Sequence, residues 1–469
     1  MTNPLERILS GRSDAAGRRP GAGGSRGGRV ARTPLVVRLA NDWWDRLISS
    51  VWSGSLADQT ARYAAHRTRS DYLFNSLGLG LWGVLFPLLT VIATQLAGTE
   101  AAGRFSMAFV IANLLQFVGT YGVRTYQVSD VDEAESFGSY QLQRAASCLL
   151  MVGVAWLWCL VKGYSGEMLS ICVGTFAFRL VDSLADVYEG RLQQCDKLWL
   201  AGISQALRCG VSIASFTVAL LVTHDVAVAS LALAGAAGVS LLLVSLPLAL
   251  LETPRSRGVR LVELREIFVE CAPAFAAQFL FVLIESVPKF AMEGALAYEN
   301  QLFFNAIYFP AQGIAMTVGL VYKPQLVRLS NIWSEPNHRG RFDLIVIAVA
   351  GVAAALTAGT LLFNVAFGVP LLGILYGTDF EPMRNQLYLM ILAGGMSAVV
   401  DFLYQIITVL RRQEVVTRSY LLTFALSVVL SVTLVATLGF NGAVWAYFAS
   451  MGALFVMLVV QYVLLRVRG

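Results

Sequence analysis

The sequence predicts an all-α polytopic membrane protein, with twelve transmembrane helices in two six-helix lobes around a central cavity. Three observations predict this fold: an apolar composition, twelve apolar segments of spanning length, and basic loops that alternate with neutral ones. Of the 469 residues, 57% are hydrophobic and 14% are charged, whereas soluble domains carry about 25% charged residues. The net charge of +5 does not indicate nucleic acid, because the basic residues cluster between apolar segments, where membrane topology explains them.

Two segments precede the first span. Residues 1–33 are rich in glycine and arginine and cannot bury enough apolar surface to fold, which predicts a disordered cytoplasmic tail rather than a nucleic-acid-binding arm. Within residues 34–70, Val36, Ala40, Trp43 and Leu47 recur every three or four positions. This spacing predicts an amphipathic helix. It leaves open whether the helix lies in the membrane surface or packs on the cytoplasmic face of the protein.

From residue 71 onward, apolar segments of about 20 residues recur, which is enough to cross a hydrocarbon layer of about 30 Å. Basic loops alternate with nearly uncharged ones such as Gly98–Glu100 and Thr223–Asp225, which predicts that both termini are cytoplasmic. The predicted spans are Tyr72–Gln95, Ala101–Tyr121, Tyr140–Val161, Met168–Tyr188, Leu198–Val222, Val226–Leu251, Ile267–Phe290, Leu302–Tyr322, Leu344–Phe367, Leu387–Leu410, Tyr420–Leu438 and Ala443–Leu465.

A basic loop in mid-chain, Glu252–Glu266, divides the spans six and six. We therefore predict an amino-terminal lobe over residues 71–251, a cytoplasmic linker over 252–266 and a carboxy-terminal lobe over 267–469. Internal duplication of this kind is typical of transporters. The one long outer loop, Gly368–Gln386, is largely apolar around Asp379 and Glu381, which argues against an enzyme that must hold sugars and acid–base groups there.

The fourth span contains charged residues within its apolar run. Arg179, Asp182, Asp186, Glu189 and Gln193 fall at i, i+3, i+7, i+10 and i+14, which places them on one face of a helix. Ionisable groups inside a membrane face protein or a wet cavity. Two interpretations stay open: Arg179 and Asp182 take part in gating or ion coupling, or they form an ion pair that joins two helices.

Two further spans carry charge at a similar depth. Arg179, Arg208 and Asp401 each lie nine or ten residues from a cytoplasmic helix end, or roughly 13–15 Å along the axis. We therefore predict a shared polar layer, in which Asp182 and Asp401 keep the two arginines paired. Arginine gives bidentate contacts to phosphate, so Arg208 is also a candidate for binding an anionic headgroup.

The seventh span carries Glu285 and Lys289 at i, i+4, with the glutamate first, which is the favourable order for an ion pair. Pro273 and Pro288 would kink this helix, as a gate requires. The competing interpretation is a pair that reaches out to the outer interface. The six cysteines occur singly and the three histidines lie outside the spans, so we predict no metal site and no cofactor.

Three segments carry a family resemblance: Tyr121–Arg144, Asp182–Leu198 and Leu375–Met383. They resemble the bacterial oligosaccharide flippases, the polysaccharide-export branch of the multidrug/oligosaccharidyl-lipid/polysaccharide transporter superfamily. The resemblance extends over Asp71–Gly469 and rests on diffuse patterns.

The resemblance implies movement of an undecaprenyl-diphosphate-linked oligosaccharide from the inner to the outer leaflet of the bacterial cytoplasmic membrane by alternating access, for surface polysaccharide biosynthesis. Membrane lipids, a polysaccharide polymerase and glycosyltransferases would be its partners. A multidrug or cation exporter of the same superfamily and a membrane-embedded polymerase are the alternatives. Spans one, two, seven and eight would line the cavity, which points to Asn75, Arg104, Asn113, Gln116, Lys289, Asn305 and Gln312 as substrate-binding residues, with Arg208 deeper and with Arg179, Asp182, Glu285 and Asp401 in gating or coupling.

Overall fold

The computed structural model of the protein describes residues 56–130, 133–254, 258–322, 339–409 and 413–468. The chain divides into two compact units, Met1–Ala61 and Arg62–Gly469. The predicted tail over residues 1–33 and the amphipathic stripe near residue 43 lie outside the described residues. From Leu56 onward the chain is helical and leads directly into the first span.

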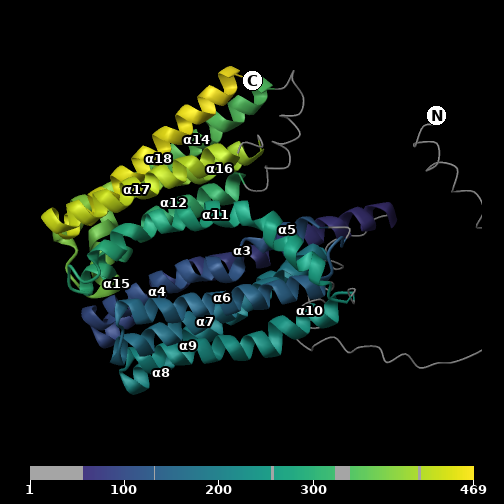
Figure 1. Cartoon of the computed structure of the whole chain (residues 1–469), viewed down its shortest axis with the longest axis horizontal. Coiled ribbons are helices and arrows are strands. Elements are labelled where there is room, and N and C mark those ends of the chain that lie inside the picture. Colours follow the sequence, from purple (N-terminus) through teal and green to yellow (C-terminus); the bar gives the residue numbers. More distant parts are fainter. Residues whose placement is uncertain (1–55, 131–132, 255–257, 323–338, 410–412, 469) are drawn as a thin grey trace, which may run out of the picture. The chain divides into compact units, whose positions relative to one another are not determined.

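Twelve helices in the described ranges are long and apolar enough to cross a membrane, as the sequence predicts. Figure 1 shows their arrangement. In chain order they are α3 (Leu56–Ala97), α4 (Thr99–Thr120), α6 (Phe137–Lys162), α7 (Gly166–Gln194), α8 (Leu198–Thr223), α9 (Val226–Ser240) with α10 (Leu246–Glu252), α11 (Leu261–Met292), α12 (Glu299–Tyr322), α14 (Arg339–Phe363) with α15 (Val369–Tyr376), α16 (Arg384–Val409), α17 (Gln413–Leu438) and α18 (Phe440–Arg468). A short helix, α5 (Val123–Ser129), follows α4.

Two of these spans contain one wide π-helical turn each. The turn Leu241–Ser245 joins α9 to α10, and the turn Asn364–Gly368 joins α14 to α15. Each precedes a proline in the first turn of the next segment. Proline has no N–H and its ring crowds the preceding turn, and a π-bulge is one of the identifiable ways in which a long helix accommodates such a disturbance.

The second of these turns corrects a prediction. The sequence predicted one long outer loop over Gly368–Gln386, but Val369–Tyr376 is helical and extends the ninth span. Residues 377–380 and the 3₁₀ turn Glu381–Met383 are all that separates it from α16. The prediction was wrong because the wide turn before Pro370 accommodates the proline ring and its missing N–H, so the apolar residues that follow can continue the helix.

The helices pack in two sets, which we call the two lobes (Figure 1). In one set α7 packs on α4, α6, α8 and α9, and in the other α16 packs on α12, α14 and α18 while α17 packs on α11 and α18. The first helix, α3, joins the first set through a glycine contact with α8: a Cβ atom on Gly202 would lie 2.3 Å from the carbonyl oxygen of Phe74. Small residues permit this close approach of two backbones.

The lobes meet at the bundle end where α3 is followed by α4. The Nζ of Lys162 lies 2.6 Å from the buried carboxylate of Glu293, and the hydroxyl of Tyr164 donates to the same carboxylate. Burial and this hydrogen bond raise the pKa of Tyr164. On α4, a Cβ atom at Gly103 would lie 2.2 Å from the carbonyl oxygen of Tyr298, so the two lobes are in close contact here.

Towards the other end, the first half of α11 contacts the amino-terminal lobe. The ring of Tyr121 stacks on Phe275, with 4.3 Å between the centroids. The Glu263 carboxylate accepts hydrogen bonds from the hydroxyls of Ser136 and Ser139 at 3.0 Å and 2.7 Å. These contacts connect α11 to the start of α6.

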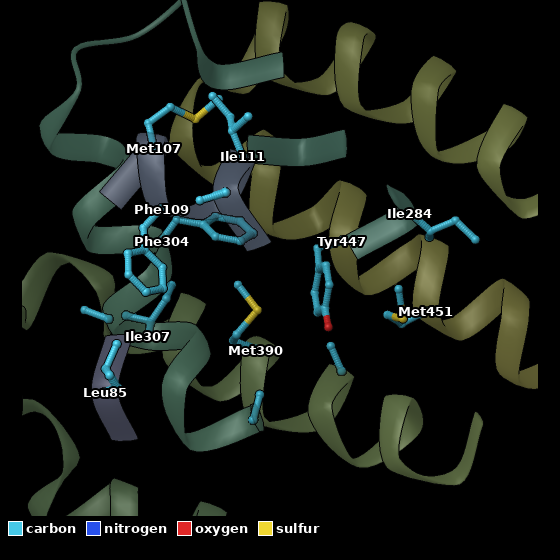
Figure 2. Close-up of a cluster of buried hydrophobic side chains, with 14 of the residues drawn as sticks. Leu85, Met107, Phe109, Ile111, Ile284, Phe304, Ile307, Met390, Tyr447 and Met451 are labelled. Carbon is cyan, nitrogen blue, oxygen red and sulfur yellow. The ribbon is translucent and has the colours of Figure 1, made fainter. Parts of the chain in front are cut away.

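One apolar core crosses the seam between the lobes (Figure 2). In this close-up Met107, Phe109 and Ile111 of α4 lie near Phe304 and Ile307 of α12. The same cluster continues to Met390 of α16 and to Tyr447 and Met451 of α18. Because these groups are close-packed, the seam acts as part of the hydrophobic interior in this conformation.

Candidate substrate cavity

A cavity of about 190 Å³ lies between the two lobes. The amino-terminal lobe contributes residues of α3, α4 and α7 to its wall, and the carboxy-terminal lobe contributes residues of α11 and α12. Apolar and aromatic side chains such as Trp82, Phe86 and Phe117 form part of the wall. Its polar members are Thr90, Asn113, Gln116, Arg179, Glu285, Ser286, Lys289, Asn305, Tyr308 and Gln312.

Five of the seven residues predicted to bind substrate lie on this wall: Asn113, Gln116, Lys289, Asn305 and Gln312. Of the four residues predicted to act in gating or coupling, Arg179 and Glu285 also line it. The structure does not bring Arg104, Arg208, Asp182 or Asp401 to the wall, and Asn75 is likewise absent from it.

Asp182 lies directly behind the wall and binds groups from four helices. Its Oδ2 accepts hydrogen bonds from Trp82 Nε1 at 2.9 Å, Gln116 Nε2 at 2.8 Å and Arg179 Nη1 at 3.1 Å. Its Oδ1 accepts from Arg208 Nε and Nη2 at 3.0 Å and 2.7 Å. Asp182 thus joins Arg179 to groups of α3, α4 and α8, as the helix-joining interpretation expects. A role of the pair in gating or ion coupling stays a prediction.

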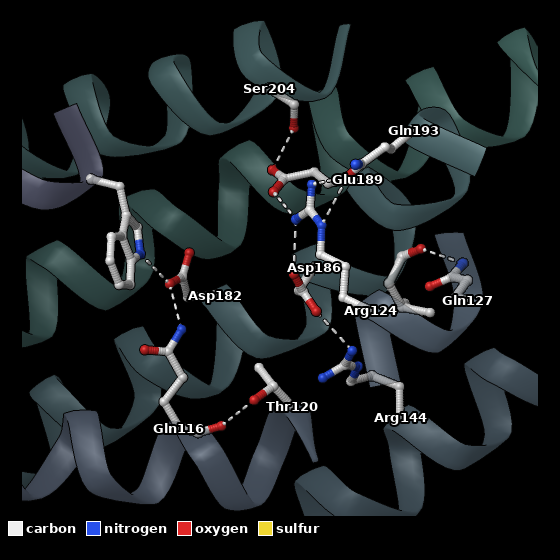
Figure 3. A network of polar contacts seen from close by, with 12 residues as sticks. Gln116, Thr120, Arg124, Gln127, Arg144, Asp182, Asp186, Glu189, Gln193 and Ser204 are labelled. Carbon is white, nitrogen blue, oxygen red and sulfur yellow. Dashed lines mark hydrogen bonds and ion pairs between the residues drawn. The ribbon is translucent and has the colours of Figure 1, made fainter. Parts of the chain in front are cut away.

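The stripe on α7 continues away from the cavity as a buried network (Figure 3). Glu189 accepts from Arg208 Nη1 at 2.5 Å. It also accepts from Ser204 Oγ at 3.1 Å, as Figure 3 shows. Asp186 forms ion pairs with Arg124 and Arg144, each at 2.8 Å. Arg124 also lies 3.7 Å from Glu189 and so joins these pairs into one network. The network contains four arginines and three carboxylates and therefore has one positive charge in excess: Arg124, Arg144, Arg179, Arg208, Asp182, Asp186 and Glu189.

Sequence reasoning missed the part that Arg124 and Arg144 play in this network. Arg124 lies between the second and third predicted spans and Arg144 near the start of the third, and neither was assigned a partner. In the structure Arg144 is 1% exposed, donates from Nη1 to the carbonyl oxygen of Gly119 at 3.0 Å, and pairs with Asp186. The sequence did contain a signal for these partners. The helical spacing placed Asp186 and Glu189 on the charged face of the fourth span, and neither had a predicted cationic partner.

Lys289 differs from these arginines. It is 7% exposed, and no carboxylate of the described residues lies within 4.0 Å of its Nζ. The Nζ lies over the ring of Tyr308, 4.6 Å from the centroid, and 5.8 Å from that of Phe304. A cation over an aromatic face is attracted by the ring quadrupole, but its charge stays available to an anion in the cavity.

The predicted ion pair between Glu285 and Lys289 is therefore not formed. The Glu285 Oε1 instead accepts from Tyr308 at 3.1 Å, Tyr447 at 3.3 Å and Ser397 at 3.4 Å. Three hydroxyl donors satisfy the carboxylate without the lysine. Both residues line the central cavity between the lobes.

Two other predicted residues have partners elsewhere. Arg104 pairs with Glu100 and Glu167 near the loop end of α4, where its side chain is 30% exposed. Asp401 accepts a hydrogen bond from Tyr322 at 2.6 Å, within the carboxy-terminal lobe. The predicted polar layer shared by Asp401 and the two arginines is not present, because Asp401 belongs to the opposite lobe and the arginines share Asp182.

No family model matches the sequence, and no curated protein matches it. Solved structures do share its fold. A lipid II flippase, MurJ, in an inward closed conformation has a TM-score of 0.63 at 11% identity, over 83% of this chain and 87% of that one. A MATE in complex with MaD3S has a TM-score of 0.60 at 14% identity, over 86% and 95% of the two chains. An inward-facing multidrug resistance MATE family transporter of the MOP superfamily gives 0.57 at 15% identity, over 82% and 94%.

The chain thus shares its fold, over most of its length, with these MATE structures and this flippase. At 11–15% identity the likeness concerns the fold and not the substrate. What the protein moves has to be argued from the wall of the cavity.

Proposed function

We propose that the protein is a flippase that moves a polyprenyl-diphosphate-linked oligosaccharide from the inner to the outer leaflet of the bacterial cytoplasmic membrane. The observation that carries this proposal is Lys289, a nearly buried cation on the cavity wall without a carboxylate partner within 4.0 Å. A diphosphate cannot enter a low-dielectric space uncompensated, because burying an unpaired ion costs several kcal/mol. Lys289 supplies the compensating charge.

The rest of the wall supports the same substrate class. Across the cavity Arg179 presents a guanidinium that belongs to a network with one excess positive charge. Four side-chain amides, those of Asn113, Gln116, Asn305 and Gln312, suit a sugar with many hydroxyl groups. Alternating access would then move the headgroup between the lobes while the lipid chain stays in the bilayer.

A cation exporter is the second candidate, and Glu285 is the observation that favours it. This carboxylate lies on the carboxy-terminal side of the wall, beside aromatic rings that could receive a cation. However, no described wall residue of the amino-terminal lobe is a carboxylate, and the nearest one, Asp182, is bound to two arginines. The wall as a whole therefore favours an anion.

Reconstitution into liposomes tests the two candidates directly. The purified full-length chain should move a fluorescent polyprenyl-diphosphate-linked glycan from one leaflet to the other, and it should not move ethidium, an organic cation. Empty liposomes and liposomes with a Lys289→Ala variant serve as controls. Transport of ethidium without transport of the glycan lipid would refute the flippase and establish the cation exporter.

A further inference from the structure

Two asparagines on opposite walls of the cavity each have a buried side-chain oxygen without a hydrogen-bond partner. Asn113 Oδ1 belongs to α4 and Asn305 Oδ1 to α12, and neither has a partner among the described residues. Most buried polar atoms in proteins are hydrogen-bonded, so each exception calls for an explanation. Because both residues line the same cavity, a ligand with hydrogen-bond donors would explain both.

The orientation of the Asn305 amide is fixed by its neighbours. Its Nδ2 donates to the carbonyl oxygen of Gln301 at 2.8 Å and to Ser106 Oγ at 3.4 Å. A backbone carbonyl can only accept, so exchanging the amide nitrogen and oxygen would set two acceptors against each other. The oxygen of Asn305, which is 6% exposed, is therefore the atom left without a donor.

The Asn305 oxygen and Lys289 belong to the same wall of the cavity and share a neighbour. Gln301 Nε2 donates to the carbonyl oxygen of Lys289 at 2.7 Å, and Gln301 is also the residue that fixes Asn305. The Lys289 Nζ lies over the rings of Phe304 and Tyr308, which flank Asn305 on α12. Asn305 and Lys289 thus belong to one part of the cavity wall, where a single ligand can contact both.

We propose that Asn113 and Asn305 determine specificity by accepting hydrogen bonds from the sugar that is attached to the diphosphate. This inference rests on the proposed function and adds to it. Lys289 recognises the anion, whereas the two amide oxygens require hydroxyl or amide N–H donors on the first sugar. A bare polyprenyl phosphate or diphosphate, which offers no such donors, leaves both oxygens unsatisfied and binds less tightly.

Leucine variants provide a sharp test, because leucine is close in size to asparagine and carries no polar atom. Asn305→Leu removes the unsatisfied oxygen together with the amide donor of the Gln301 carbonyl oxygen and Ser106 Oγ, so the control must lose a comparable amide donor. The Asn364→Leu variant is a matched control: Asn364 is 6% exposed, its Nδ2 donates to the Thr360 carbonyl oxygen at 2.8 Å, and it lies off the cavity wall. Asn305→Leu should melt within a few degrees of this control.

The measurement is the binding of two probes to the full chain in nanodiscs: farnesyl diphosphate, and farnesyl diphosphate that carries one N-acetylhexosamine. The unaltered protein should prefer the sugar-bearing probe about tenfold, which is about 1.4 kcal/mol. Asn113→Leu and Asn305→Leu should each reduce this ratio, and the double variant should reduce it to about one. The Asn364→Leu control should keep the full ratio.

Two results would overturn the inference. One is an unaltered protein that binds both probes equally while Lys289→Ala weakens both, which would keep the proposed function and remove the sugar contact. The other is a double variant that retains the preference, which would mean that water or protein satisfies both oxygens. Failure of the unaltered protein to bind either probe would instead refute the proposed function.

Discussion

The two walls of the cavity hold their cations in different ways. On the amino-terminal side Arg179 shares Asp182 with Arg208, and the pairs continue through Glu189 and Asp186. On the carboxy-terminal side the Lys289 Nζ lies over aromatic faces, with no carboxylate of the described residues within 4.0 Å. Removing one member of a buried ion pair leaves an uncompensated charge, whereas removing a cation from an aromatic face does not.

This difference indicates that the charges of the amino-terminal wall stabilise the fold, whereas the cation of the carboxy-terminal wall can bind a ligand. The arginines of the amino-terminal lobe join α3, α4, α7 and α8 through one carboxylate, so their charges stabilise the fold before any ligand arrives. Within the described part of the chain, Lys289 takes part in no such ion-pair network, so its charge is available to an anion. Four substitutions test this distinction.

Asp182→Ala should have the largest effect. It removes the acceptor of Trp82, Gln116, Arg179 and Arg208 at once, and breaking a buried pair costs about 3–5 kcal/mol. We expect a large drop in melting temperature and in the yield of monodisperse protein. Asp401→Ala is the control, because it loses one hydrogen bond, from Tyr322. Equal stability of the two variants would mean that the network does not support the lobe.

Lys289→Ala should weaken binding of the anion and leave folding intact. A charge-assisted hydrogen bond to an anion contributes about 1.5–3 kcal/mol, so the affinity for farnesyl diphosphate should fall by more than about tenfold. The melting temperature should stay near that of the unaltered protein, because no ion pair is broken. Lys289→Arg keeps the charge and should retain more transport per folded molecule than Lys289→Ala. Full transport by Lys289→Ala would exclude the lysine from substrate contact.

Glu285→Gln should tighten anion binding by about threefold. The carboxylate shares the wall with Lys289 and repels an incoming phosphate, and at a high effective dielectric such a repulsion amounts to about 0.7 kcal/mol. The amide oxygen can still accept from Tyr308, Tyr447 and Ser397, so the fold should be retained. The measurement is the affinity for farnesyl diphosphate at two salt concentrations. Weaker binding would show that Glu285 positions Lys289 instead of opposing the anion.

Arg104→Ala should have the smallest effect. Its partners Glu100 and Glu167 are 67% and 43% exposed, and exposed ion pairs contribute about 0–1 kcal/mol. We expect the melting temperature and the flipping rate to stay close to those of the unaltered protein. A large loss of transport with intact stability would place Arg104 on the substrate path, in a conformation with the loop ends of the lobes apart.

Several features follow from the sequence alone. Segment length and hydropathy identify the twelve spans, because only a helix of about 20 apolar residues satisfies its backbone in lipid. The 3.6-residue period also places Arg179, Asp182, Asp186 and Glu189 on one face of α7, and the charge on that face requires a protein or aqueous environment. Likewise, Asn305, Tyr308 and Gln312 share a face of α12, and all three line the cavity.

Only the tertiary structure decides what those faces meet. The i, i+4 spacing of Glu285 and Lys289 permits an ion pair, but hydroxyl groups from α12, α16 and α18 surround the glutamate and aromatic rings hold the lysine. Arg144 is indistinguishable from a topology-setting loop arginine until α6 packs on α7 and brings it to Asp186. Helical periodicity fixes which residues share a face, whereas the rotation and contact of neighbouring helices fix which charges are neutralised and which remain free for a ligand.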